Sequence, residues 1–246
     1  VEAIHASFVS VGRELEARGL RADLLLADLG FASTQVDDAD RGLSFMRDGP
    51  LDMRLDASAG MTAADLVAKV SERDLAEIIT RYGEDPLARR IAAKITAARA
   101  VAPIKTTAQL AELVRDAYGN RAHASRMHPA TKTFQALRIA VNDEIGALEA
   151  LLDSIHRAAQ RAHEGRPTWL APGARVAIVA FHSLEDRSIK RSFVEWERQG
   201  WASRLTKKPL VANESEQAHN PRSRSAKLRA VRLEPRGEDD AWQDHG

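Results

Sequence analysis

The chain has 246 residues, of which 44% are hydrophobic and 29% are charged, so its composition is that of a globular protein and not of a disordered one. It contains no cysteine, which excludes disulfide frameworks, thiolate metal sites and cysteine nucleophiles. It also has no apolar run of the roughly 20 residues that a membrane helix needs. We therefore expect a protein of the reducing cytoplasm that does not enter a membrane.

The charges almost cancel but are unevenly distributed. Residues 1–56 carry 6 basic and 11 acidic side chains, whereas residues 186–232 carry 12 basic and 5 acidic ones. A near-neutral protein must bind a polyanion through a local patch, and the second stretch is the candidate. The chain begins at Val1 without a methionine or a signal segment, so we expect it to begin inside a fold.

The first half predicts a helix, a strand and then a long loop. A short helix ends at Gly19, and the apolar run 23–28 favours a buried parallel strand that ends in Asp28. The segment 28–56 is rich in Gly, Asp and Ser, and long loops of this kind are usually functional. Residues 61–119 then predict three consecutive helices without a strand between them.

The second half alternates helices and strands. The predicted elements are one long helix from Pro129 through Leu152, a turn at 170–173, a strand at 175–181, a helix from Leu184 to Arg198 and an edge strand at 225–233. This alternation predicts the α/β class, a doubly wound Rossmann-like sheet with an inserted all-helical subdomain. We expect the α/β domain at 1–58 and 125–246, and the helical insertion at 59–124.

Two segments suggest chemistry and also have simpler explanations. Asp28 follows a strand, where a carboxylate faces the ligand crevice of an open α/β sheet, or else forms a turn. Residues 181–187 contain adjacent His182 and Ser183, but the Gly-x-Ser-x-Gly elbow of a serine hydrolase is missing. Ser183 is better explained as a helix N-cap with Asp186 in the capping-box position.

Two further segments have compositions that suggest ion binding. The acidic stretch around Asp38 fails as a calcium loop, because its glycine comes one position early and no glutamate closes it, so we expect no metal site. Residues 220–229 combine Arg222, Arg224 and two further cations with serine hydroxyls. Phosphate groups are bound by this composition, and a solvated charge run is the alternative.

Taken together, these motifs resemble the bacterial 16S rRNA cytosine-N4 methyltransferases. The matching blocks are long and span nearly the whole chain in the order of that family. They comprise residues 26–30, Ser33, Gln35, 37–38, 41–42, 44–54, 82–84, 89–92, 128–131, 134–139, 141–142, 181–187 and 220–222.

The resemblance implies an enzyme that uses S-adenosylmethionine and acts on 16S rRNA, or the small ribosomal subunit, at one cytosine of the decoding centre. The implied cofactor-binding residues are Phe8, Asp28 and Gln35, and the candidate catalytic residues are Asp28 and Ser33. The candidate substrate-binding residues are Phe45, Arg47, Asn142, His182, Arg222 and Arg224. The oligomeric state is left open.

This chain departs from the family in two places. The family's Ser-Ser-Pro-Gln loop is replaced by residues 32–35, Ala-Ser-Thr-Gln. Its Gly-rich, His-containing cofactor loop and its acidic ribose ligand are expected upstream of Val1, so we expect this chain alone to be weak or inactive. The alternatives are a non-catalytic RNA-binding protein that retains the fold, and a methyltransferase that acts on another substrate.

The exocyclic amine of the target cytosine determines what the enzyme must do. Its lone pair is delocalised into the cytosine ring, so the enzyme must flip the base, align the amine with the methyl group and accept an N–H hydrogen bond. Asp28, Ser33 or a backbone carbonyl is the candidate acceptor, and Phe45 or Phe181 is the candidate stacking surface.

Overall fold

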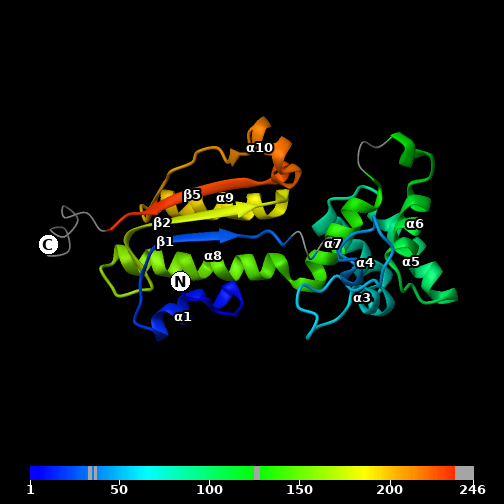
Figure 1. Cartoon of the computed structure of the whole chain (residues 1–246), viewed down its shortest axis with the longest axis horizontal. Coiled ribbons are helices and arrows are strands. Elements are labelled where there is room, and N and C mark those ends of the chain that lie inside the picture. Colours follow the sequence, from blue (N-terminus) through cyan, green and yellow to red (C-terminus); the bar gives the residue numbers. More distant parts are fainter. Residues whose placement is uncertain (33–34, 36–37, 125–127, 236–246) are drawn as a thin grey trace. The chain divides into compact units, whose positions relative to one another are not determined.

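The chain folds into two compact units, Val1–Gly30 with Ile145–Gly246, and Phe31–Glu144. The first unit contains the β-sheet and the second is helical (Figure 1). The computed structural model describes residues 1–32, 35, 38–124 and 128–235.

The first unit is built on a mixed sheet. Its strands are β1 (Ala22–Asp28), β2 (Leu170–Ala180), β3 (Ala202–Arg204), β4 (Leu210–Val211) and β5 (Lys227–Leu233). The strand order is β1-β2-β5-β3, and β4 pairs with β5. β1 and β2 are parallel, with Asp28 opposite Val179, while β5 is antiparallel to its partners. The predicted α/β class with a Rossmann-like arrangement is confirmed.

The strand predicted at an edge is an interior strand. β5 pairs with β2 on one side and with β3 and β4 on the other. The alternation of small apolar and basic residues predicted that the basic side chains face solvent. In the structure, the buried residues of β5 are Arg229, Val231 and Leu233. Arg229 is only 6% exposed because Asp186 pairs with its guanidinium, so a basic residue occupies a core-facing position.

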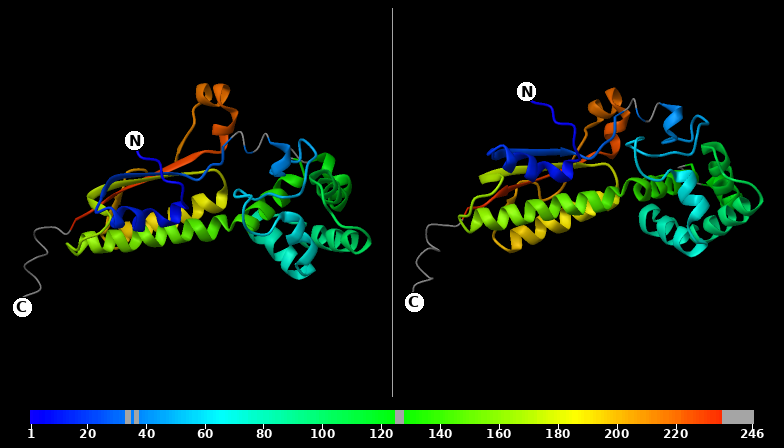
Figure 2. Two further views of the ribbon diagram at one scale, coloured as in Figure 1. Left: turned by 60° about the horizontal axis from the view of Figure 1, so that its bottom comes forward. Right: turned by 90° about the horizontal axis from the view of Figure 1, so that it is seen from below.

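Three helices cover one face of the sheet: α1 (Val11–Ala17), α8 (Glu144–His163) and α9 (Ser183–Arg198) (Figure 2). Leu152 and Ile155 of α8 and Phe193 of α9 pack with the inward side chains of β2 in one core cluster. In β1, Leu25 and Ala27 pack against this core, whereas Leu24 and Leu26 are 63% and 61% exposed. The predicted strand is therefore present, but it is not buried on both faces as expected.

The segment predicted as a turn belongs to β2. Ala22 pairs with Leu170 and Leu24 pairs with Arg175, so β2 carries an irregular bulge opposite β1. Gly173 has a φ of 78°, a conformation that only glycine adopts without strain, and it lies within this bulge. The Pro-Gly signal therefore marks a bend inside a strand.

In residues 61–119 of the second unit, where three helices were predicted, the structure has four. They are α3 (Ala63–Lys69), α4 (Glu72–Gly83), α5 (Ala88–Val101) and α6 (Thr107–Tyr118), and α7 (Ala130–Asn142) completes the unit. Thr62 and Thr106 form capping boxes at the starts of α3 and α6. The short 3-10 segments η2 (Ala39–Arg41) and η3 (Gly119–Ala124) also lie in the second unit. A further 3-10 segment, η1 (Phe8–Ser10), precedes α1 in the first unit.

The helical unit extends past 59–124 on both sides. Leu51 and Met53, which precede α3, are 1% and 0% exposed and belong to the same core cluster as Leu75 of α4 and Leu137 of α7. Pro50 also forms a β-bridge with Thr106. Burial of these side chains holds the preceding loop and α7 in the helical unit.

The long helix predicted from Pro129 is interrupted at Asp143. This residue has a φ of 48° and ends α7, so α8 begins as a separate helix at Glu144. Arg138 pairs with Glu144 across the break, with Nε and Oε1 2.7 Å apart. Among the described helices, none combines the length and the apolar composition that crossing a bilayer requires.

Candidate functional site

The carboxyl ends of β1 and β2 bring Asp28, Gly30 and Phe181 together; we call these three residues the strand-end cluster. Both strands point the same way in Figure 1, and Asp28 lies opposite Val179, two residues before Phe181. In open α/β sheets, ligands bind beyond the carboxyl ends of the strands. The cluster therefore lies where the sequence predicted a site.

Asp28 is exposed, and one of its two carboxylate oxygens accepts a hydrogen bond. The Gly30 N–H donates to its Oδ1 at 2.8 Å, and in the described part of the chain its Oδ2 has no hydrogen-bond partner. A Cβ atom at Gly30 would lie 2.8 Å from the Phe181 ring and 2.9 Å from Asp28 Oδ1. Glycine is therefore required here, because any side chain would push the ring or the carboxylate away.

The N-cap residue of α9 is His182 and not Ser183. The Glu185 N–H donates to His182 Nδ1 at 3.4 Å, and Glu185 Oε2 accepts from the N–H groups of Phe181 and His182. The prediction shifted the capping box by one residue, because it counted serine but not histidine as a cap. The His182 side chain is only 8% exposed, and its Nε2 lies 3.0 Å from Glu185 Oε1.

Asp186 joins α9 to β5. Its carboxylate accepts from the Arg229 guanidinium at 2.6 and 3.3 Å, and the Lys227 ammonium lies 3.7 Å away. Burial alone would raise the pKa of Asp186, but hydrogen bonding and attraction from Arg229 and Lys227 outweigh it and hold the pKa below its usual value. The sequence analysis placed Arg229 among the phosphate contacts. In the structure, its guanidinium is instead paired with Asp186 inside the fold.

Asn142 and Phe45, two predicted substrate-binding residues, make internal contacts in the helical unit. The Asn142 amide donates to the Met53 carbonyl at 2.8 Å and accepts from the Leu55 N–H at 2.7 Å, so it ties the loop before α3 to α7. The Phe45 ring stacks on His128, with the ring centroids 4.5 Å apart.

Two further predicted residues, Arg47 and Gln35, form hydrogen bonds within the helical unit. Arg47 is exposed, and its carbonyl accepts from the Thr107 hydroxyl. Gln35 Oε1 accepts from the Ala32 N–H at 3.0 Å, and Gln35 and Asp28 belong to different units. Ser33 lies outside the described residues.

The remaining candidates lie at the surface of the first unit. Phe8 is 44% exposed and begins η1, the short 3-10 turn that leads into α1. Arg222 and Arg224 are exposed on η4 (Pro221–Ser225), which follows the short helix α10 (Glu214–His219).

Sequence reasoning missed two arrangements. The contact of Gly30 with Phe181 carries only a weak signal, a glycine two residues after a strand. The Arg138 guanidinium lies 4.5 Å from the centre of the Phe31 ring and also pairs with Glu144. No spacing in the sequence predicts the pairing of Arg138 with Glu144, because this pairing depends on the helix break at Asp143.

The chain is similar to known proteins over most of its length. The family model described as the MraW methylase family matches residues 1–234. Ribosomal RNA small subunit methyltransferase H of Synechococcus sp. (strain WH7803) is 51% identical over 213 residues, which are 86% of this chain and 65% of that protein. The protein of the same name from Sorangium cellulosum (strain So ce56) is 46% identical over 236 residues, 94% of this chain and 69% of that protein.

A third relative of that name, from Deinococcus deserti (strain DSM 17065 / CIP 109153 / LMG 22923 / VCD115), is 51% identical over 218 residues, 88% of this chain and 67% of that protein. The chain thus spans about two thirds of the length of the curated relatives it matches.

Proposed function

The chain belongs to the MraW methylase family, and we propose that it is part of an enzyme that transfers a methyl group from S-adenosylmethionine to the N4 amine of a cytosine in 16S rRNA. Relatives that are about half identical carry the name ribosomal RNA small subunit methyltransferase H, which supports the reaction class and the substrate. The decoding-centre cytosine and the cytoplasmic location follow from the family resemblance and are part of the proposal.

The observation that carries the proposal is the strand-end cluster. An exposed carboxylate and an aromatic ring meet at the carboxyl ends of two adjacent parallel strands, because Gly30 leaves room for both. This set of groups fits S-adenosylmethionine, since a carboxylate attracts its cationic groups and an aromatic face accommodates cations and flat rings. Asp28 would contact the cofactor, and Phe8 and Gln35 are further candidates.

The proposed chemistry requires little of the protein beyond positioning. When bound, the cofactor supplies an electrophilic methyl group, so the chain needs no covalent nucleophile. Asp28 Oδ2 accepts an N–H of the cytosine amine, which localises the nitrogen lone pair toward the methyl carbon. The new N–C bond would form as the bond between the methyl carbon and the cofactor sulfur breaks, with its electron pair staying on the sulfur. The amine would lose one proton, which the exposed Asp28 carboxylate would take up and pass to water. Ser33 is the alternative acceptor.

The proposed substrate contacts fall into two kinds. Phe181 offers a ring for stacking, and the exposed Arg47, Arg222 and Arg224 are suited to phosphate. The contacts of Phe45, Asn142 and His182 support roles in positioning loops and helix ends rather than in direct recognition. The Asn142 amide, for example, already bonds to two backbone groups of one loop.

Analysis of methylated nucleosides tests the proposal. Unmethylated small subunits are incubated with labelled S-adenosylmethionine and either this chain or a version extended to the length of its relatives, then digested and analysed by mass spectrometry. We expect N4-methylcytidine in the small subunits that were incubated with the extended version.

Two other outcomes separate the alternatives. RNA binding without methyl transfer, and without heat of S-adenosylmethionine binding in calorimetry, would indicate a non-catalytic RNA-binding protein. A methyl group on another nucleoside or on protein would indicate a different substrate.

A further inference from the structure

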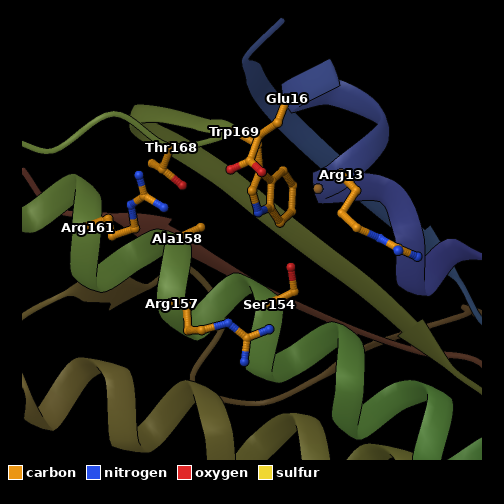
Figure 3. A pocket seen from close by; sticks show the side chains of 9 residues that line it. Arg13, Glu16, Ser154, Arg157, Ala158, Arg161, Thr168 and Trp169 are labelled. Atoms are coloured by element: carbon orange, nitrogen blue, oxygen red, sulfur yellow. The ribbon is translucent and has the colours of Figure 1, made fainter. Parts of the chain in front are cut away.

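A pocket of about 210 Å³ lies between α1, α8 and the start of β2 (Figure 3). Trp169 directly precedes β2, so the pocket is at the amino end of this strand, whereas the strand-end cluster is at its carboxyl end. All the residues that line it belong to the first unit. It is therefore separate from the proposed site of methyl transfer.

Two largely buried residues contribute polar groups to the lining of this pocket. Trp169 is 4% exposed and Thr168 is 8% exposed. Within the described ranges, neither the Trp169 indole N–H nor the Thr168 hydroxyl has a hydrogen-bond partner, and Figure 3 shows both at the pocket wall. Both atoms reach the open space of the pocket, so they are available to donate hydrogen bonds to a ligand there.

Gly12 of α1 makes the indole accessible. A Cβ atom at this position would lie 2.7 Å from Trp169 Nε1, so any other residue would cover the donor or displace the ring. Ala158 and Ser154 of α8 are also small and line the same pocket. The space in front of the indole therefore depends on small residues from two helices.

The charges around the pocket favour an anion. Arg13, Arg157 and Arg161 line it, and none of the three forms an ion pair with another described residue. Glu16 is the one carboxylate in this lining. An adjoining hollow of about 390 Å³ shares Arg13, Ser154 and Arg157 and adds Asp153.

We propose that this pocket binds a phosphate group. The ionised oxygens of a phosphate group accept hydrogen bonds, and the pocket offers guanidinium forks, an indole N–H and hydroxyl groups, which all donate. Charge-assisted hydrogen bonds are roughly twice as strong as neutral ones, and arginine often makes two of them to one phosphate group. The group could belong to an RNA backbone or to a free phosphate compound, and the proposal does not depend on methyl transfer.

The indole N–H of Trp169 provides a direct measurement. The chain has four tryptophans, so its ¹H–¹⁵N spectrum has four indole signals, and loss of one in the Trp169→Phe variant assigns it. We expect a saturable shift of the Trp169 signal when inorganic phosphate is added. A signal that stays in place, or that moves equally with chloride at the same ionic strength, would overturn the proposal.

Paired variants test the charges. The double variant Arg157→Ala/Arg161→Ala should weaken phosphate binding about tenfold or more, because it removes two charged donors. Lys190→Ala/Arg191→Ala removes the same charge from exposed positions of α9 and should leave the affinity unchanged. Glu16→Gln should bind phosphate more tightly than the parent. Equal affinities in all four proteins would contradict the proposal, provided that circular dichroism shows them folded.

A short single-stranded RNA distinguishes the source of the phosphate. If the backbone binds here, RNA shifts the Trp169 signal, and Arg157→Ala/Arg161→Ala lowers the slope of log affinity against log salt by up to about 1.4, at roughly 0.7 per phosphate contact. If only inorganic phosphate shifts the signal, the ligand is a small phosphate compound.

Discussion

At the scale of single residues, the proposed chemistry depends most on Asp28. In an active, extended version of the chain, Asp28→Asn should lower the methyl-transfer rate about a hundredfold or more, because one positioned hydrogen bond in a catalytic site contributes about 3 kcal/mol. Stability should change little, since asparagine can still accept from the Gly30 N–H at this exposed position.

Asp23→Asn is the matched control for this prediction. Asp23 is exposed on the same strand and loses the same charge, but it lies at the opposite end of β1. Initial rates with small subunits compare the two variants. If Asp28→Asn turns over as fast as Asp23→Asn, Asp28 is a turn residue and the acceptor must be sought elsewhere.

The pair formed by Asp186 and Arg229 leads to a prediction about stability. The Arg229 side chain is 7% exposed, so Asp186→Ala leaves a buried cation without its partner and should cost about 3–5 kcal/mol of unfolding free energy at neutral pH. Replacing both residues with apolar ones, Asp186→Leu/Arg229→Met, should recover much of the loss. Urea unfolding measures both effects.

The pH dependence of this effect has a defined sign. The pKa of Asp186 is lower in the folded protein than in the unfolded chain, so its carboxylate stabilises the fold above the unfolded value, and this contribution is lost as the pH falls through the folded pKa. The stability difference between parent and Asp186→Ala should therefore shrink in acid. A difference that stays constant down to the lowest pH would show that the pair is not the cause.

At the scale of secondary-structure elements, one hydrogen bond ties the end of α6 to the turn before α5. The Tyr118 hydroxyl donates to Asp85 Oδ2 at 2.8 Å, and Asp85 is only 4% exposed. Burial and the neighbouring carboxylate both disfavour the phenolate and raise the pKa of Tyr118 to about 12. Because the folded pKa lies above the unfolded one, this contribution is complete below about pH 10 and is lost as the pH rises toward 12.

Tyr118→Phe should therefore reduce the unfolding free energy by about 1–3 kcal/mol at neutral pH, since a buried acceptor loses its donor. The deficit should narrow above about pH 10, where the parent loses the same contribution. Tyr82→Phe is the control, because the Tyr82 hydroxyl makes no hydrogen bond to any described residue. Equal stability of the two variants would assign no role to the bond with Asp85.

The sequence predicted some elements well because their signals are local. The apolar run before Asp28 is β1, and the predicted helix after His182 is α9, within one residue at its start. The strand end that carries Asp28 was predictable for the same reason. Its neighbour Phe181 was not, because their contact depends on pairing between strands that are far apart in the chain.

Other elements depend on contacts that a local pattern does not contain. The apolar periodicity continues across Asp143, but this residue adopts a left-handed conformation, and the two helices separate there. The spacing of basic residues in β5 suggested a solvent face, whereas Asp186 on a different element draws Arg229 into the core. In both cases a tertiary contact or a backbone conformation overrides the pattern.

At the scale of the whole molecule, the near-zero net charge means that the proposed RNA binding would depend on local patches. The structure reduces the predicted basic segment, because Arg229 is buried and Lys227 lies 3.7 Å from the Asp186 carboxylate. Arg222 and Arg224 remain exposed on η4. We therefore expect these two arginines to account for most of the electrostatic contribution of this segment.

Arg222→Ala/Arg224→Ala should weaken RNA binding at low salt and flatten the slope of log affinity against log salt by up to about 1.4, because roughly 0.7 is lost for each single-strand phosphate contact. Lys190→Ala/Arg191→Ala removes the same charge from α9 and should leave the slope unchanged. Fluorescence anisotropy with labelled RNA across a salt series measures all three proteins. Equal slopes would show that η4 is a solvated surface, and the RNA-binding face would then be sought on α5, whose Arg89, Arg90 and Lys94 are exposed cations of the helical unit.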